Sequence, residues 1–182
     1  AAIVQQMGIP IERCFRTLGA TALDDAAFAT LLATFRQHYA AAANTHIRLY
    51  PGIAGLLAAL RAQDRQTGII SSKKGAIFRA NCDAPGISAQ IDVFIGSDDV
   101  AHYKPHPDGI TRALAGLDRP AASAIYIGDA TTDIEAGRAA GVQTCAVTWG
   151  AHDTTTLAAA RPDALVHDVS ALQHLLLSST AR

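Results

Sequence analysis

The sequence predicts an α/β fold in which helices cover an open parallel sheet. From residue 53 onward, short runs of β-branched and other apolar residues alternate with segments whose apolar residues recur at helical spacing. This alternation is typical of β-α-β units, whose parallel strands are buried on both faces. Apolar residues make up 49% of the chain and aromatic residues only 5%, which favours helices packed on a sheet over an all-β fold.

The region before residue 53 predicts helices only. Apolar residues between positions 28 and 35 follow helical spacing, and no strand-like run occurs from residue 3 to residue 44. Residues 21–25 have the polar and acidic side chains of a helix start, and Tyr50-Pro51-Gly52 breaks the pattern. We therefore expect a helical region over residues 1–48 and an α/β core over residues 49–182.

The elements of the core follow from the period of its apolar residues. Helices are predicted over residues 53–62, 75–82, 108–115, 133–140 and 169–177, and strands over residues 67–71, 93–96, 124–127, 144–147 and 164–166. Open parallel sheets bind their ligands at the carboxyl ends of the strands. We therefore expect the functional residues where these strands end.

A pair of aspartates follows the strand predicted over residues 124–127. The strand leads into Gly128 and Asp129, and Asp133 comes four residues after Asp129. Two carboxylates at the start of a helix can hold Mg²⁺ beside a phosphate group, because this hard cation prefers oxygen ligands. The alternative is that both aspartates cap the helix or offset its dipole. The pair is a candidate metal site.

Two serines end the strand predicted over residues 67–71. The sequence there is Ser71-Ser72-Lys73-Lys74-Gly75. A hydroxyl at a strand end, followed by backbone amides that open a helix, suits a phosphate group. The alternative is a serine cap beside solvated lysines. The segment is a candidate phosphate site.

A lysine lies in the proline-rich sequence Tyr103-Lys104-Pro105-His106-Pro107. The prolines on both sides of His106 are expected to hold this stretch extended and outside any helix. A lysine fixed there can place its ammonium group over developing negative charge, whereas the alternative is an ordinary exposed lysine. His102 and His106 are four residues apart, but the prolines argue against a helical pair of metal ligands.

Composition argues against several other classes of protein. A formal net charge of −1 gives no sign of a nucleic-acid or anionic-membrane partner. The three cysteines, Cys14, Cys82 and Cys145, have no CxxC spacing, which fits a reducing compartment and disfavours a disulfide framework or zinc knuckle. The longest apolar stretch, residues 53–60, is too short to cross a bilayer, and no signal peptide or lipidation motif occurs. We expect a cytoplasmic protein and leave its oligomeric state open.

The order of these features resembles the haloacid dehalogenase-like (HAD) hydrolase superfamily, most closely its phosphoglycolate phosphatase-like branch. A hydroxyl at a strand tip comes first, a lysine beside prolines second, and an aspartate pair at a later strand tip third. Flanking sequences such as Val-Thr-Trp-Gly at residues 147–150 agree, and the resemblance spans nearly the whole chain. It implies a Rossmann-like core with a partial helical cap over residues 1–48, a Mg²⁺ cofactor and a small phosphorylated metabolite as substrate.

The resemblance also implies a role for each candidate residue. Ser71 matches the second motif of the family, which hydrogen-bonds the transferring phosphoryl group, and Lys104 matches the third motif, which orients the nucleophile and the phosphate. Asp129 and Asp133 match the fourth motif, which holds Mg²⁺. Additional phosphate contacts are expected from three further residues, namely Ser72, Lys73 and Gly128.

One motif of the family is missing. The sequence contains no Asp-x-Asp-Gly-Thr, whose first aspartate is the nucleophile and whose second is the general acid and base. In the family this motif ends a strand between those that carry Ser71 and Asp129. The only early acidic pair, Asp24-Asp25, lies in helical sequence. We therefore expect an N-terminally truncated version of a longer protein, inactive as written.

The expected activity of the longer protein is Mg²⁺-dependent hydrolysis of phosphomonoesters through a phosphoaspartyl intermediate. Two alternatives remain: a sugar-phosphate mutase of the same superfamily, and a non-catalytic phosphate- or protein-binding relative. A nucleotide-binding sheet is disfavoured, because neither GxGxxG nor GxxxxGK[ST] occurs. The substrate is left open, and the helical region offers scattered candidates for its recognition in Arg13, Arg16 and Arg48.

Overall fold

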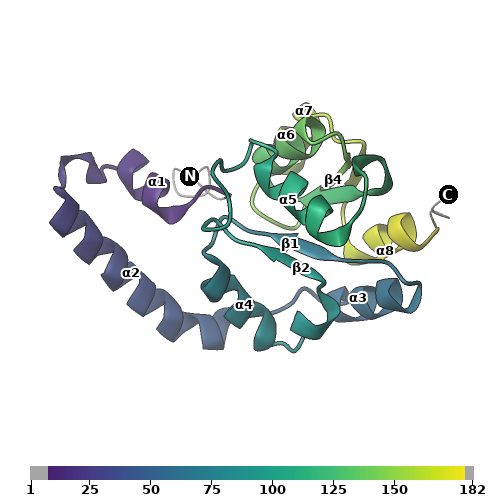
Figure 1. Cartoon of the computed structure of the whole chain (residues 1–182), viewed down its shortest axis with the longest axis horizontal. Coiled ribbons are helices and arrows are strands. Elements are labelled where there is room, and N and C mark those ends of the chain that lie inside the picture. Colours follow the sequence, from purple (N-terminus) through teal and green to yellow (C-terminus); the bar gives the residue numbers. More distant parts are fainter. Residues whose placement is uncertain (1–7, 179–182) are drawn as a thin grey trace.

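The computed structural model describes residues 8–178, apart from the side chains of residues 44 and 45. The elements in chain order are α1 (Ile11–Thr17), η2 (Ala20–Ala22), α2 (Asp25–His46), α3 (Ile53–Ala62), β1 (Gly68–Ile70), α4 (Gly75–Asp83), η3 (Ser88–Gln90), β2 (Val93–Ile95), α5 (Asp108–Leu117), η4 (Ala121–Ser123), β3 (Ile125–Gly128), α6 (Thr131–Ala139), β4 (Gln143–Val147), α7 (Thr154–Ala159), β5 (Ala164–Val166) and α8 (Val169–Ser178). The predicted α/β class is confirmed (Figure 1).

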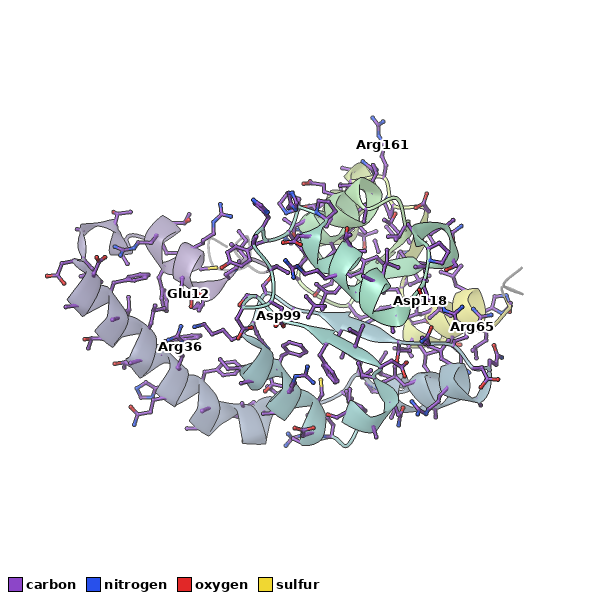
Figure 2. All side chains as sticks on the ribbon, in the orientation of Figure 1. Glu12, Arg36, Arg65, Asp99, Asp118 and Arg161 are labelled. Carbon is purple, nitrogen blue, oxygen red and sulfur yellow. The ribbon has the colours of Figure 1, made fainter. Side chains whose placement is uncertain are left out.

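Helices α1 and α2 form an arm, residues 11–46, that extends away from the strands (Figure 1). Helix α2 begins where the Asp24 carboxylate accepts the backbone N–H of Ala27 at 2.8 Å. Glu12 and Arg36 join the two helices through an ion pair of 2.7 Å (Figure 2). The prediction of helices only is therefore confirmed for residues 8–46, while residues 1–7 lie outside the described part. The predicted domain boundary at residue 48 falls in the connection between α2 and α3.

The described strands form two parallel sheets. Strand β1 pairs with β2 in one sheet, and β3, β4 and β5 pair in that order in the other. One edge of β1 and one edge of β3 therefore have no strand partner within residues 8–178. The prediction placed a further strand between these two, and the described residues supply none there.

Helices cover both faces of the β3-β4-β5 sheet. On one face α3 and α8 bury Leu56 and Leu172 in a cluster with Cys145 of β4. On the other face Ile110 of α5, together with Ala136 and Val142, forms a cluster against which Tyr126 of β3 packs. Ile70 of β1 packs against this same cluster, so one layer of side chains connects the two sheets. This layer places the carboxyl ends of β1 and β3 in one part of the molecule.

The structure corrects the predicted elements in three places. Helix α7 was not predicted; it begins where Asp153 accepts the Thr156 N–H at 2.9 Å. Helix α6 begins at Thr131, two residues before the predicted start. The stretch around Lys104 is a turn and not extended, because His106 N–H donates to the Tyr103 carbonyl at 3.0 Å around a cis Lys104–Pro105 peptide. The described residues include no helix with the length and apolar character that a membrane span requires.

Candidate active site

The carboxyl ends of β1 and β2 border a small hollow, called here the phosphate hollow. Its lining includes Ser71 and Ser72 after β1, Ser97 after β2, and His102, Tyr103 and Lys104 from the loop that leads to α5. Three of the predicted site residues, Ser71, Ser72 and Lys104, therefore come together although they are distant in the sequence. Gly128, Asp129, Asp133 and Lys73 are not among the lining residues.

Lys104 is held by an ion pair with Asp133. Its Nζ lies 2.6 Å from Asp133 Oδ1, and the side chains are only 13% and 5% exposed. The other carboxylate oxygen of Asp133 accepts the Ala130 N–H at 3.1 Å, and the Tyr126 hydroxyl donates to Oδ1 at 3.3 Å. Both oxygens of Asp133 thus have partners within the protein. The pair links the loop after β2 to the helix after β3.

Burial and charge determine the protonation of this group. Burial alone would lower the pKa of Lys104, but the adjacent Tyr126 and Asp133 outweigh that effect and raise this pKa above its ordinary value. Burial, opposed by the nearby lysine, raises the pKa of Tyr126 to about 12. Near neutral pH, Lys104 is therefore a cation and Tyr126 a neutral hydrogen-bond donor.

Glycine at position 128 makes room for Asp133. A Cβ built on Gly128 would lie 2.2 Å from the Cβ of Asp133, a separation that real Cβ atoms essentially never show. Gly128 ends β3, so the following helix can bring its first-turn carboxylate directly against the strand. In the structure Gly128 thus permits close approach of a side chain, whereas the sequence suggested a phosphate contact.

Asp129 is held by the loop that follows β4. Its Oδ2 accepts the Ala151 N–H at 2.9 Å, and its carbonyl accepts the His152 N–H at 3.0 Å. A Cβ on Gly150 would lie 2.1 Å from that same Oδ2, so only glycine leaves space for the carboxylate. The sequence analysis noted Trp149-Gly150 as part of a flanking sequence but not its role; the available signal was a glycine in the loop three residues after the predicted strand 144–147.

The Asp129 carboxylate is a ligand of the kind that Mg²⁺ prefers. Mg²⁺ is usually bound by one or two carboxylates together with water and substrate phosphate oxygens. Residues 8–178 contain no group of three or more His, Cys, Asp or Glu side chains that could form a complete metal cage. The buried Thr132 Oγ1 also has no hydrogen-bond partner within these residues, but it faces Gly8, where a Cβ would lie 3.3 Å from it. Asp133, by contrast, has its two oxygens engaged by Lys104 and Ala130.

The polar groups of the segment after β1 lie partly in the phosphate hollow and partly against other protein groups. The Ser71 hydroxyl accepts the Lys73 N–H at 3.1 Å and lines the phosphate hollow. The Gly75 N–H at the start of α4, expected to face phosphate, donates to Asp98 at 2.7 Å. The Lys73 ammonium lies 5.2 Å from the ring centre of Tyr39 on α2, and Lys73 does not line the hollow.

The chain is similar to several known proteins. Residues 1–147 match the family model described as haloacid dehalogenase-like hydrolase. The sequence is 34% identical over 173 residues to the probable phosphatase IndB of Dickeya dadantii, covering 93% of this chain and 74% of that protein. It is also 34% identical over 145 residues to a plasmid-encoded phosphoglycolate phosphatase of Cupriavidus necator, covering 80% of this chain and 63% of that one.

A solved structure shows the same fold. A haloacid dehalogenase-like hydrolase from Bacteroides fragilis superposes with a TM-score of 0.78 at 29% identity, and the match covers 94% of this chain and 81% of that one. The matched part thus spans about three quarters of IndB but less than two thirds of the Cupriavidus protein.

Proposed function

Because the chain belongs to the haloacid dehalogenase-like hydrolase family, we propose that it binds phosphate and Mg²⁺ in a phosphomonoester hydrolase of the phosphoglycolate phosphatase type. One observation carries the proposal: Lys104, buried in its ion pair with Asp133, lines the same hollow as Ser71 and Ser72. A fixed cation beside strand-end hydroxyls suits the negative oxygens of a phosphoryl group. The substrate class is a small phosphorylated metabolite, and a cytoplasmic location is part of the same proposal.

Each side chain has a distinct role in this proposal. The Ser71 hydroxyl donates to a non-bridging phosphoryl oxygen, and the Lys104 ammonium balances the charge that builds up during transfer. Asp133 positions Lys104 and keeps it charged, because an isolated buried ammonium would be costly. Asp129 holds Mg²⁺, which when bound supplies further charge neutralisation at the phosphoryl oxygens.

The nucleophile is proposed to be the first aspartate of an Asp-x-Asp-Gly-Thr motif, which these 182 residues lack. One of its carboxylate oxygens bonds to phosphorus while the phosphorus–oxygen bond of the ester breaks. The leaving oxygen takes a proton from the second aspartate of the motif. That carboxylate then takes a proton from water, whose oxygen bonds to phosphorus and displaces the first aspartate, which releases inorganic phosphate.

The arm is proposed to act as the cap that closes over the site. Asn81 on α4 donates to the Tyr39 hydroxyl on α2 at 3.0 Å, and the Ser72 hydroxyl donates to the Gly8 carbonyl at 2.5 Å. The first contact joins the arm to α4, and the second joins Ser72, which lines the phosphate hollow, to the residue three positions before α1. A closed cap excludes bulk water from the reacting groups and selects the leaving group.

The test is a turnover assay on a protein that carries Asp-x-Asp-Gly-Thr on a strand upstream of this sequence. We expect release of inorganic phosphate from small phosphomonoesters with Mg²⁺ and none with a chelator. Ser71→Ala should lower kcat by about 10²-fold, since it removes one donor to the transferring group. Failure of the wild-type protein to release phosphate from any monoester with Mg²⁺ present contradicts the proposal.

The same assay separates the alternatives. A mutase would convert a sugar phosphate into its isomer with little free phosphate, and a non-catalytic relative would bind phosphate without turnover.

A further inference from the structure

We infer that a second anion site, lined by Arg13, His102, Tyr103 and His106, receives the leaving group of the substrate. The inference rests on the proposed function, since it concerns what is attached to the phosphoryl group. The site, called here the leaving-group hollow, has a volume of about 540 Å³ and lies between helix α1 and the loop that leads from β2 to α5 (Figure 1). Its lining is completed by Ala101, Pro105 and Pro107.

The two hollows adjoin each other. His102 and Tyr103 line both of them, and Lys104, the next residue, lines the phosphate hollow. To reach Arg13 from a phosphoryl group at Ser71 and Lys104, a phosphomonoester must pass His102 and Tyr103, and the phosphate hollow, about 20 Å³ in volume, must widen. The leaving-group hollow is wide open to solvent, and its volume of about 540 Å³ leaves room for more than a two-carbon acid.

The lining of the leaving-group hollow favours an anion. It holds one guanidinium and two imidazoles and no carboxylate. Within residues 8–178, Arg13 has no ion-pair partner, whereas the neighbouring Glu12 is paired with Arg36. Asp108, which could otherwise offset the charge, accepts the backbone N–H groups of Ala101 and His102 at 2.8 and 3.2 Å. A free guanidinium can bind a carboxylate or a phosphate with two parallel hydrogen bonds.

His106 is oriented as a donor. The Asp108 N–H donates to its Nδ1 at 3.2 Å, so the neutral ring carries its proton on Nε2. The His102 ring lies beside it, with ring centres 4.4 Å apart. Because both rings line the leaving-group hollow, they can donate to an anionic oxygen that Arg13 attracts.

The other two arginines singled out in the sequence are used elsewhere. Arg16 donates to the carbonyls of Ala20 and Leu23, at 2.9 Å each, and stacks on the ring of Phe28. The guanidinium of Arg16 therefore stabilises the loop between α1 and α2. Arg48 donates to the carbonyl of its neighbour Ile47. Arg13 is the one of these three that lines a hollow.

The experiment measures binding by titration calorimetry to the folded 182-residue chain in the presence of Mg²⁺. Four probes are compared: inorganic phosphate, glycerol 3-phosphate, 3-phosphoglycerate and propane-1,3-diyl bisphosphate. The last two add a carboxylate or a second phosphate to a skeleton close to that of glycerol 3-phosphate. We expect at least one of them to bind about ten-fold tighter than glycerol 3-phosphate, the gain of a charge-assisted bidentate contact.

Substitutions of Arg13 test whether this residue causes the gain in affinity. Arg13→Gln should remove the ten-fold gain and leave the affinity for inorganic phosphate unchanged, and Arg13→Lys should restore part of the gain. Arg161→Gln makes the same change of charge on a side chain that points away from the rest of the molecule and does not line the hollow, and should behave as wild type (Figure 2). The imidazole NMR signals of His106, which lines the leaving-group hollow and not the phosphate hollow, should shift with the favoured ester and not with inorganic phosphate.

Each outcome has a definite meaning. A gain with 3-phosphoglycerate alone identifies a carboxylate as the group bound, and a gain with the bisphosphate alone identifies a phosphate. If inorganic phosphate binds but neither added anion improves affinity, or if Arg13→Gln keeps the gain, the inference is overturned and the proposed function stands. If no probe binds, the proposed function fails and the inference fails with it.

Discussion

At the scale of single residues, two glycines decide where the carboxylates of the site can lie. Gly128 admits Asp133 against β3, and Gly150 admits Asp129 against the loop after β4. Neither glycine has a positive φ, so backbone freedom does not explain them. Both are required because a single methyl group would occupy the space of a carboxylate. The two glycines thus determine the positions of the Asp129 and Asp133 carboxylates by leaving space for them.

Gly150→Ala tests this directly. The added methyl group would collide with Asp129 Oδ2, which must move, and we expect the affinity for Mg²⁺ to fall by about 10-fold or more while the fold is kept. Calorimetric titration with Mg²⁺ measures the change. The matched control is Gly55→Ala in the first turn of α3, where a Cβ meets nothing within 4 Å and alanine should stabilise the helix by roughly 0.5–1 kcal/mol. Equal Mg²⁺ affinity in wild type and Gly150→Ala would show that Asp129 is not a ligand.

At the scale of elements, helix α7 stabilises the loop that holds Asp129. Asp153 caps α7 through the Thr156 N–H, and the loop between β4 and α7 donates the Ala151 N–H to Asp129. The cap is charge-assisted, because the backbone N–H and hydroxyl of Thr156 lower the pKa of Asp153. The order of the metal site should therefore depend on a cap that lies several residues away from it.

Asp153→Ala should lower the melting temperature at pH 7 by about 2–4 °C, as loss of a helix cap does in a chain of this size. The pKa of Asp153 is lowered in the folded state, so its stabilising effect is present above the ordinary carboxyl pKa of about 3.9 and disappears as pH falls through the lower value. Wild type and Asp153→Ala should consequently melt alike near pH 2. Asp153→Asn keeps the cap without the charge, and its melting point should stay close to wild type at pH 7.

Element positions were largely predictable, and the exceptions have physical reasons. Strands such as β5 and helices such as α3 show a clear apolar period, and both were predicted with their observed bounds. Helix α7 has six residues, three of them β-branched threonines, so the sequence carries almost no helical period. The turn at Lys104 depends on a hydrogen bond between His106 and Tyr103, which the proline pattern does not reveal.

The sequence predicted which residues belong to the candidate site better than it predicted which of them contact one another. Strand ends identified Ser71 and Asp129, because the carboxyl ends of parallel strands are where ligands bind. The pairing of Lys104 with Asp133 joins residues 29 positions apart, and only the folded chain shows it. The same holds for Tyr126 and Arg13, since neither lies in a pattern that distinguishes it from an ordinary core tyrosine or a surface arginine.

At the scale of the whole molecule, the two parallel sheets leave one edge of β1 and one edge of β3 without a strand partner among the described residues. Exposed strand edges invite pairing with other chains. A strand upstream of this sequence, as proposed for the nucleophile, would pair with such edges and cover apolar side chains beside Ile70 and Ile127.

A chain extended upstream by that strand should be more stable than the 182-residue chain by at least about 2 kcal/mol, the effect of burying one or two large apolar side chains. Urea unfolding measures the difference, and the denaturant slope should rise because more surface becomes buried. A version with a proline in the middle of the added strand is the control, since proline removes a ladder hydrogen bond. Equal stability of the extended chain and its proline version would mean that no strand is added to either sheet.

Lys104 also has a mechanical consequence. Within residues 8–178, β2 and β3 are not hydrogen-bonded to each other. The Lys104 ammonium, in the segment after β2, nevertheless contacts the carboxylate of Asp133, in the helix after β3. One ion pair therefore connects the two sheets at the proposed active site. Replacing Lys104 with a neutral residue would remove both the connection between the sheets and the positive charge in the site. An inactive Lys104 variant therefore does not show which of these two effects abolishes activity.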